Sequence, residues 1–133
     1  MMNRKNKGTK AERELISMFL NTGTWIANRI AGSGSCRHPS PDIIAGNVKR
    51  KIAMECKATS DSKQYLSKKQ VEGLKEYCAL FGAEPWIGVR FDNLDWYFLT
   101  LEDLQETEGE NYVVTIPLAK RRGLLFEELI GIF

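Results

Sequence analysis

Hydrophobic residues recur every three or four positions in two stretches of the chain, which is the spacing of an amphipathic helix. These stretches predict helices over 9–20 and 67–81, and Gly82 directly follows the second, as glycine commonly follows a last helical turn. Each predicted helix begins with a capping-box pair, a hydroxyl residue followed three positions later by Glu or Gln: Thr9 with Glu12, and Ser67 with Gln70.

Shorter apolar runs, bounded by glycine, proline and polar residues, predict strands in the rest of the chain. A short helix over 101–107 and a helical segment from about Leu124 complete the order of elements. Helices that alternate with strands in this way indicate an α/β fold, a mixed central sheet of about five strands flanked by helices. The predicted strands cover 25–31, 42–45, 51–58, 85–91, 96–100 and 112–116.

The charge is distributed unevenly between the two halves of the chain. With 133 residues, 43% of them hydrophobic, the chain has the length of a single domain, 1–133, with an ordinary core. Residues 1–70 contain 14 Lys and Arg against 5 Asp and Glu, whereas 71–133 contain 5 against 12, giving +9 followed by −7. We expect 1–8 to form a mobile basic arm, and the basic half to face a polyanion.

Cysteine and histidine are too few to suggest a disulfide framework or a zinc site. The three cysteines, Cys36, Cys56 and Cys78, include no C-x-x-C pair, and His38 is the single histidine. No apolar run approaches the length of a membrane span, and the polar N-terminus lacks the apolar segment of a signal peptide. We therefore expect a cytoplasmic protein with free thiols and no membrane contact.

Charged residues interrupt the two central strands at positions that do not serve a core. Side chains alternate along a strand, so Glu55 and Lys57 share one face of 51–58. Asp42 begins the preceding strand and reaches the same place if the two strands pair as a hairpin, because paired strands lie about 4.8 Å apart. The sequence thus predicts two carboxylates and an ammonium at one point of the sheet.

Two carboxylates and a lysine suit phosphodiester hydrolysis. Mg²⁺ prefers oxygen ligands, and one or two carboxylates suffice when substrate phosphate and water supply the rest. A lysine beside the metal can position the attacking water and offset negative charge on the phosphate. An acid-x-Lys triplet is a weak signal by itself, since Asp61-Ser62-Lys63 is another, and the alternative interpretation is an ion pair on a solvated strand face.

Glu12 and the basic residues around it extend the pattern to the first predicted helix. Glu12 either completes the capping box with Thr9 or, flanked by Lys10 and Arg13, is an acid on a phosphate-facing surface. The basic residues have the alternative of a solvated surface, but together they can supply the phosphate contacts that dominate DNA affinity. They are Arg4, Lys5, Lys7, Lys10, Arg13, Arg29, Arg37 and the run 49–51.

Four motifs in register make the resemblance to a known family specific. A basic arm with K-G-x-x-A-E-R-E-L, then N-R-I-A-G-S-G-S, then P-D-I-I-A-G-N, and then M-E-C-K follow one another at fixed distances. In this order the chain resembles the archaeal Holliday junction resolvases, of the restriction-endonuclease-like nuclease superfamily. The match covers most of the chain and is strongest over 4–82.

The resemblance implies roles for individual residues. It implies that Glu12, Asp42 and Glu55 are metal-site acids, that Lys57 is the catalytic lysine, and that the main-chain carbonyl of Cys56 is a further metal ligand. It also implies a serine near the cleaved phosphate, either Ser33 or Ser35, and basic positions near the scissile strand at Arg13 and Arg29. Gln70 matches a polar helix position of related nucleases.

The leading hypothesis is a Mg²⁺-dependent endonuclease that cuts four-way DNA junctions as a homodimer, with Mn²⁺ as a substitute metal. The alternatives are a restriction-type or repair nuclease of the same fold, and a DNA-binding module without catalysis. The apolar C-terminal segment from Leu124 predicts that this end is covered, with a second copy of the chain as one candidate. A two-fold dimer suits the near two-fold symmetry of a four-way junction.

Overall fold

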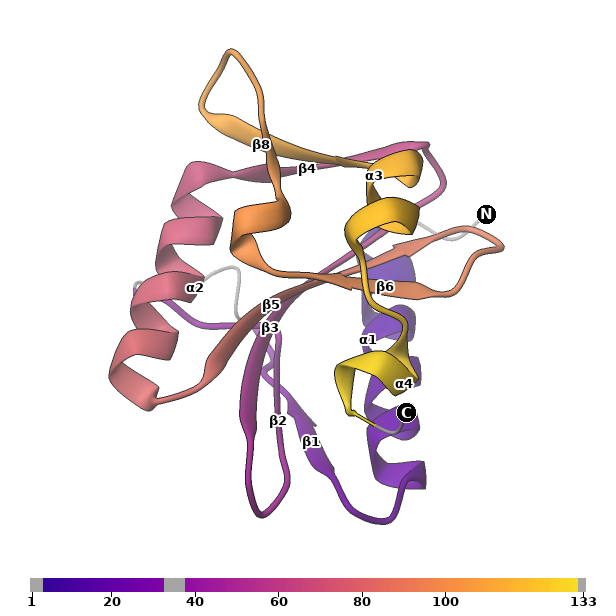
Figure 1. The fold of residues 1–133 in the computed structure, drawn as a ribbon, viewed down its shortest axis with the longest axis vertical. Coiled ribbons are helices and arrows are strands. Elements are labelled where there is room, and N and C mark those ends of the chain that lie inside the picture. The colour runs from indigo at the N-terminus through magenta and orange to yellow at the C-terminus, as the bar shows by residue number, and fades with distance from the viewer. Residues whose placement is uncertain (1–3, 33–37, 132–133) are drawn as a thin grey trace.

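A five-stranded mixed sheet forms the centre of the protein (Figure 1), in a computed structural model that describes residues 4–32 and 38–131. The strand order is β1-β2-β3-β5-β6, with β3 and β5 parallel and the other neighbours antiparallel. The expected mixed sheet of about five strands is therefore confirmed. The strands are β1 (Ile26–Arg29), β2 (Ile43–Gly46), β3 (Lys51–Thr59), β5 (Glu84–Phe91) and β6 (Trp96–Leu99).

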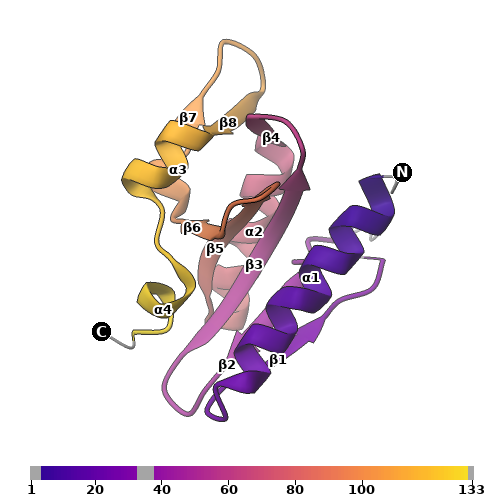
Figure 2. The same ribbon diagram turned by 90° about the vertical axis from the view of Figure 1, so that its right-hand side faces the viewer.

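Both faces of the central sheet are covered, and the two cores have different partners. On one face α1 (Arg4–Asn21) and the short α4 (Phe126–Leu129) pack on β1 to β3 and β6, as Figure 2 shows for α1. On the other face α2 (Lys68–Phe81) packs on β3 and β5. Glu55 and Lys57 point toward the α2 side, so the face that bears these charges is also partly enclosed.

A second, three-stranded sheet lies on the α2 side and was not predicted. Its order is β4-β8-β7, and the short helix α3 packs beside it and on β6. We expected a polar connection where β4 lies, and a helix over 101–107 where a single 3-10 turn, η2 (Leu101–Asp103), leads into β7. The remaining bounds are β4 (Lys63–Ser67), β7 (Gln105–Glu106), β8 (Asn111–Thr115) and α3 (Ile116–Arg122).

The first helix begins earlier than its capping signal predicted. α1 starts at Arg4, so Thr9 lies inside the helix and the predicted start at Thr9 is wrong. The described part of the expected basic arm, residues 4–8, belongs to the same helix, and Lys7 forms an ion pair with Asp92 in the β5–β6 turn. Among the described helices, none combines the length and apolar character needed to cross a membrane.

The second helix begins and ends where its capping residues predicted. Ser67 is the N-cap, and its Oγ accepts a 3.1 Å hydrogen bond from the Gln70 N–H. The Gln70 side chain returns the bond by accepting from the Ser67 N–H at 3.0 Å. Gly82 ends the helix with φ of 78°, in the left-handed region that glycine adopts readily. Because both ends of α2 are capped at defined residues, the helix presents a fixed set of side chains to the sheet.

The apolar C-terminal segment is buried against its own chain. Phe126 contacts Phe19 of α1 edge-to-face with ring centroids 5.0 Å apart, and Leu129 is almost fully buried in the same core. Only Leu125 among its large apolar side chains within the described residues remains exposed, at 38%. Packing within one chain therefore covers most of this segment, without a second copy.

Candidate functional site

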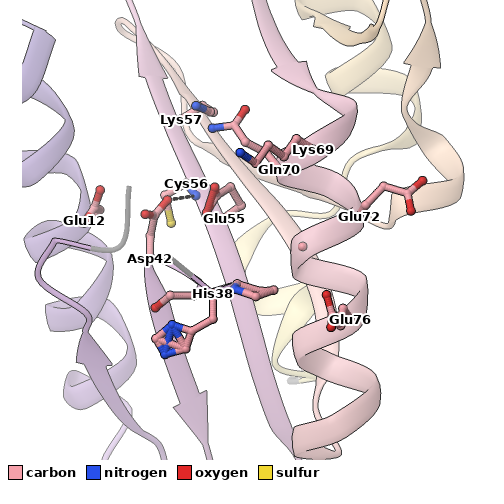
Figure 3. A pocket seen from close by; sticks show the side chains of 13 residues that line it. Glu12, His38, Asp42, Glu55, Cys56, Lys57, Lys69, Gln70, Glu72 and Glu76 are labelled. Carbon is pink, nitrogen blue, oxygen red and sulfur yellow. Dashed lines mark hydrogen bonds between the residues drawn. The ribbon is translucent and has the colours of Figure 1, made fainter. Parts of the chain in front are cut away.

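A cavity of about 750 Å³ lies between α1 and α2, at the end of β2 (Figure 3). All four residues that the sequence predicted for a metal site line it, together with residues of α2 and of the segment that precedes β2. The lining consists of Glu12, His38, Pro39, Ser40, Asp42, Glu55, Cys56, Lys57, Lys69, Gln70, Glu72, Gly73 and Glu76.

Asp42 lies where β2 stops pairing regularly with β3. The register pairs Ile43 with Met54, yet the Asp42 N–H also donates to the Met54 carbonyl, at 2.9 Å. Two residues of one strand thus face one residue of the other, as in a β-bulge, a distortion that redirects side chains next to active sites. The Asp42 carboxylate continues the hydrogen bonding along β3, where Oδ2 accepts from the Cys56 N–H at 2.8 Å.

Glu55 is the carboxyl group most strongly affected by this environment. Burial raises its pKa to about 8, and the charge of Asp42 and a hydrogen bond with the Asp42 side chain act in the same direction. Lys57 opposes the shift by a smaller amount. Asp42 and Glu55 thus lie close together with a proton between them. A divalent cation could replace this proton and offset the charge of both carboxylates.

Glu12 lies on α1 and is held by a basic residue of β1. The Arg29 Nε donates to Glu12 Oε1 at 2.9 Å, and Arg29 Nη2 reaches Thr9 Oγ1 at 3.4 Å. Burial and the charge of Asp42 raise the pKa of Glu12, whereas Arg29 lowers it. Glu12 is therefore close enough to Asp42 for their charges to repel, and Arg29 is the cationic partner of Glu12.

The chemistry of the donor set fits a hard divalent cation. Asp42 and Glu55 offer carboxylate oxygens inside the cavity, beside the main chain of Cys56. Within the described residues, no group of three or more His, Cys, Asp and Glu side chains is arranged as a ready metal site. Mg²⁺ does not need such a group, because it keeps several waters and binds through one or two carboxylates with substrate oxygens.

The predicted basic and hydroxyl residues differ in their relation to the cavity. Arg29 lies at the site through its ion pair with Glu12, whereas Lys10 and Arg13 are exposed on α1 outside the cavity lining. Lys7 is paired with Asp92. Arg4 and Lys5 are described only as helical backbone, and Ser33, Ser35 and Arg37 lie outside the described residues.

The cavity also contains residues that sequence reasoning did not assign to the site. Lys69, Glu72 and Glu76 of α2 form its outer wall, and Gln70 lies beside them near Lys57 (Figure 3). Positions 69, 72 and 76 recur with helical spacing, so a polar stripe along one side of the predicted helix was a usable signal. His38 lines the opposite part of the cavity, and its closeness to Asp42 in sequence was another such signal.

Comparisons with known proteins find relatives that match nearly the whole chain. A family model for archaeal Holliday junction resolvases matches residues 3–133. The chain is 34% identical to the crossover junction endodeoxyribonuclease Hjc of Archaeoglobus fulgidus, with 96% of this chain and 97% of the relative aligned. It is 32% identical to the Methanocaldococcus jannaschii Hjc, over 98% and 92%. The solved structure of the A. fulgidus resolvase superimposes with a TM-score of 0.84, at 33% identity, covering 96% and 98%.

Proposed function

The chain belongs to the archaeal Holliday junction resolvase family, and we propose that it is an endonuclease that cuts four-way DNA junctions at the cavity between α1 and α2. The observation on which this rests is that one cavity is lined by Asp42, which directly precedes β2, and by Glu55 and Lys57 of β3. Paired cuts in two strands of the junction would resolve it during recombination. We expect this activity in the cytoplasm, where the DNA of the cell would be accessible.

We infer that the site works with Mg²⁺, for which Mn²⁺ substitutes. Asp42, Glu55 and the main-chain carbonyl of Cys56 would hold the ion, with water and phosphate oxygens as the other ligands. When bound, such an ion lowers the pKa of its water and neutralises charge on the phosphate. Binding would also release the proton that the raised pKa of Glu55 keeps at the site near neutral pH.

Lys57 is the residue that we assign to the attacking water and to the charge that develops on the phosphate. Its side chain enters the cavity next to Glu55 on the same strand face, and Gln70 approaches it from α2 (Figure 3). An ammonium group donates hydrogen bonds both to a water and to a phosphate oxygen. In-line attack of water on phosphorus breaks the bond to the 3′ oxygen and leaves a 5′ phosphate and a 3′ hydroxyl.

Glu12 and Arg29 form a supporting pair in this proposal. Arg29 neutralises Glu12 in the free protein, so the cavity does not concentrate three bare carboxylates before DNA and metal arrive. A phosphate that approaches Arg29 would compete for the guanidinium and free Glu12 to support the metal or its water. The pair therefore gives both residues a role close to the scissile strand.

We also propose that the enzyme acts as a two-fold homodimer. A four-way junction has near two-fold symmetry, and two copies of the cavity related by such an axis would face two strands of like geometry. The exposed apolar residues of the described chain, among them Leu125, provide surface for such an interface. A single junction would then bind to both cavities of the dimer.

The decisive experiment compares a four-way junction with a linear duplex at equal concentration in Mg²⁺. Wild-type protein is expected to introduce symmetric nicks in the junction and none in the duplex. Asp42→Asn keeps an oxygen that accepts from the Cys56 N–H, so it should fold and bind the junction but not cut it. Cleavage of the duplex would instead indicate a repair or restriction nuclease, and binding without cleavage under any divalent ion would indicate a DNA-binding module.

A further inference from the structure

Few of the groups that line the cavity can bind a DNA phosphate. Five carboxylates line it, on Glu12, Asp42, Glu55, Glu72 and Glu76. Against them stand two ammonium groups, Lys57 and Lys69, and the imidazole of His38. A strand brings one phosphate for about every 3.4 Å of helix rise, so the phosphates that flank the scissile one must also be accommodated. Each group in the cavity that can donate to a phosphate therefore matters.

His38 occupies a part of the cavity that no other assigned residue serves. In Figure 3 the carboxyl groups of Asp42 and Glu55 lie between Lys57 and His38, so the two potential phosphate donors are at different ends of the acidic centre. On the α2 side, Glu72 and Glu76 face the same space. An imidazolium in this position offers two N–H donors, and it faces an otherwise acidic wall.

The segment that bears His38 is stiff and anchored. Pro39 and Pro41 fix their own φ angles, and each restricts the residue before it to extended conformations, so His38 and Ser40 have little freedom. Pro41 is buried, and Pro39 packs on α2 at Gly73, where an added Cβ would lie 3.6 Å from the Pro39 Cβ. The backbone of His38 is thus held in place relative to both Asp42 and α2.

From this placement we propose that His38 contacts a DNA phosphate next to the scissile one and contributes to the affinity for the junction. The inference rests on the proposed function and adds a substrate-positioning residue to it. The His38 side chain is exposed and lies outside the buried core, so its replacement should leave the fold intact.

The test measures binding of a four-way junction with EDTA present, so that no strand is cut. We expect His38→Ala to weaken binding about 10-fold, as for one lost charge-assisted hydrogen bond. His38→Lys should restore the affinity. Lys75→Ala, which removes an exposed charge of α2 outside the cavity lining, is the matched control and should change the affinity far less.

Junctions with a neutral methylphosphonate at single positions then locate the contact. At the contacted phosphate, wild-type protein should lose the same factor as His38→Ala, and the variant should lose nothing more. Equal losses for both proteins at every flanking position, or an unchanged affinity of His38→Ala, would overturn the role of His38. Failure of wild-type protein to bind the junction would instead overturn the proposed function together with this inference.

Discussion

The Cys56 N–H donates a 2.8 Å hydrogen bond to Oδ2 of Asp42, and this contact organises the candidate site. Cys56 lies between Glu55 and Lys57, whose side chains both enter the cavity. By bonding to the main chain at this point, Asp42 fixes its own orientation and its distance from both neighbours. At Cys56, beyond the last paired residue of β2, the Asp42 carboxylate thus accepts the hydrogen bond that a neighbouring strand would otherwise accept. The rigid sheet therefore positions the site residues.

The raised pKa of Glu55 predicts that the metal-free protein loses stability as the pH rises. The folded-state pKa of about 8 exceeds the ordinary glutamate value of 4.5, so the folded protein retains a proton that the unfolded chain has released. The stabilisation from this proton is complete below about pH 4.5 and disappears as the pH passes 8. Over that range the expected loss is on the order of 5 kcal/mol, measured by denaturant unfolding in EDTA.

Glu55→Gln supplies the comparison for this pH dependence, because the amide cannot titrate. The variant should unfold with a nearly flat pH profile and be more stable than wild type at pH 9, although it should not cut junctions. Glu72→Gln removes an exposed carboxylate of the same cavity and should leave the wild-type slope unchanged. A wild-type profile that stays flat between pH 5 and pH 9 would contradict the raised pKa.

The ion pair between Arg29 and Glu12 predicts a coupled effect on stability and activity. Arg29→Met leaves Glu12 half-buried beside Asp42 without a cation, which should cost about 1 to 2 kcal/mol for a pair of this partial burial. Junction nicking should fall more than about 10-fold, since more than 1.4 kcal/mol of transition-state interaction is lost. Adding Glu12→Gln to Arg29→Met should restore most of the stability but none of the activity.

A second ion pair provides the control for that prediction. Arg90 and Glu14 also join the sheet to α1, with Nε and Oε1 3.2 Å apart, but outside the cavity with the acids. Glu14→Gln should therefore change stability by no more than about 1 kcal/mol and leave the nicking rate unchanged. If Arg29→Met and Glu14→Gln reduced nicking equally, the Arg29–Glu12 pair would serve only to attach α1 to the sheet.

The sequence predicted the local parts of this fold better than the distant ones. The hairpin of β2 and β3 and the helix α2 depend on neighbouring residues, and both formed as expected. β4 escaped prediction because its pairing partner β8 lies more than forty residues away, and within it only Leu66 is buried. Asp42 could be placed near Glu55 by strand pairing, but its bulge and its bond to Cys56 depend on side-chain geometry that no sequence period encodes.

Two hydroxyl residues with the same capping signature should respond differently to alanine. Ser67 is the N-cap of α2, so Ser67→Ala should destabilise the protein by about 1 kcal/mol. Thr9 lies inside α1, where alanine is the better helix former, so Thr9→Ala should change stability by less than about 0.5 kcal/mol. Thermal unfolding of the two variants measures the difference, and equal destabilisation would mean that Thr9 also caps a helix.

The proposed metal ligand at Cys56 is its main-chain carbonyl, which predicts that the thiol can be removed without loss of cleavage. The Cys56 side chain is buried in the core shared with α1, and burial raises the pKa of the thiol well above its usual value, which disfavours a thiolate ligand. Cys56→Ala should lower stability by about 1 kcal/mol and keep the Mg²⁺-dependent nicking rate within about 2-fold. Cys78→Ala, a buried cysteine of the α2-side core, is the matched control for stability. Lost nicking in a folded Cys56→Ala protein would assign the metal to the sulfur instead.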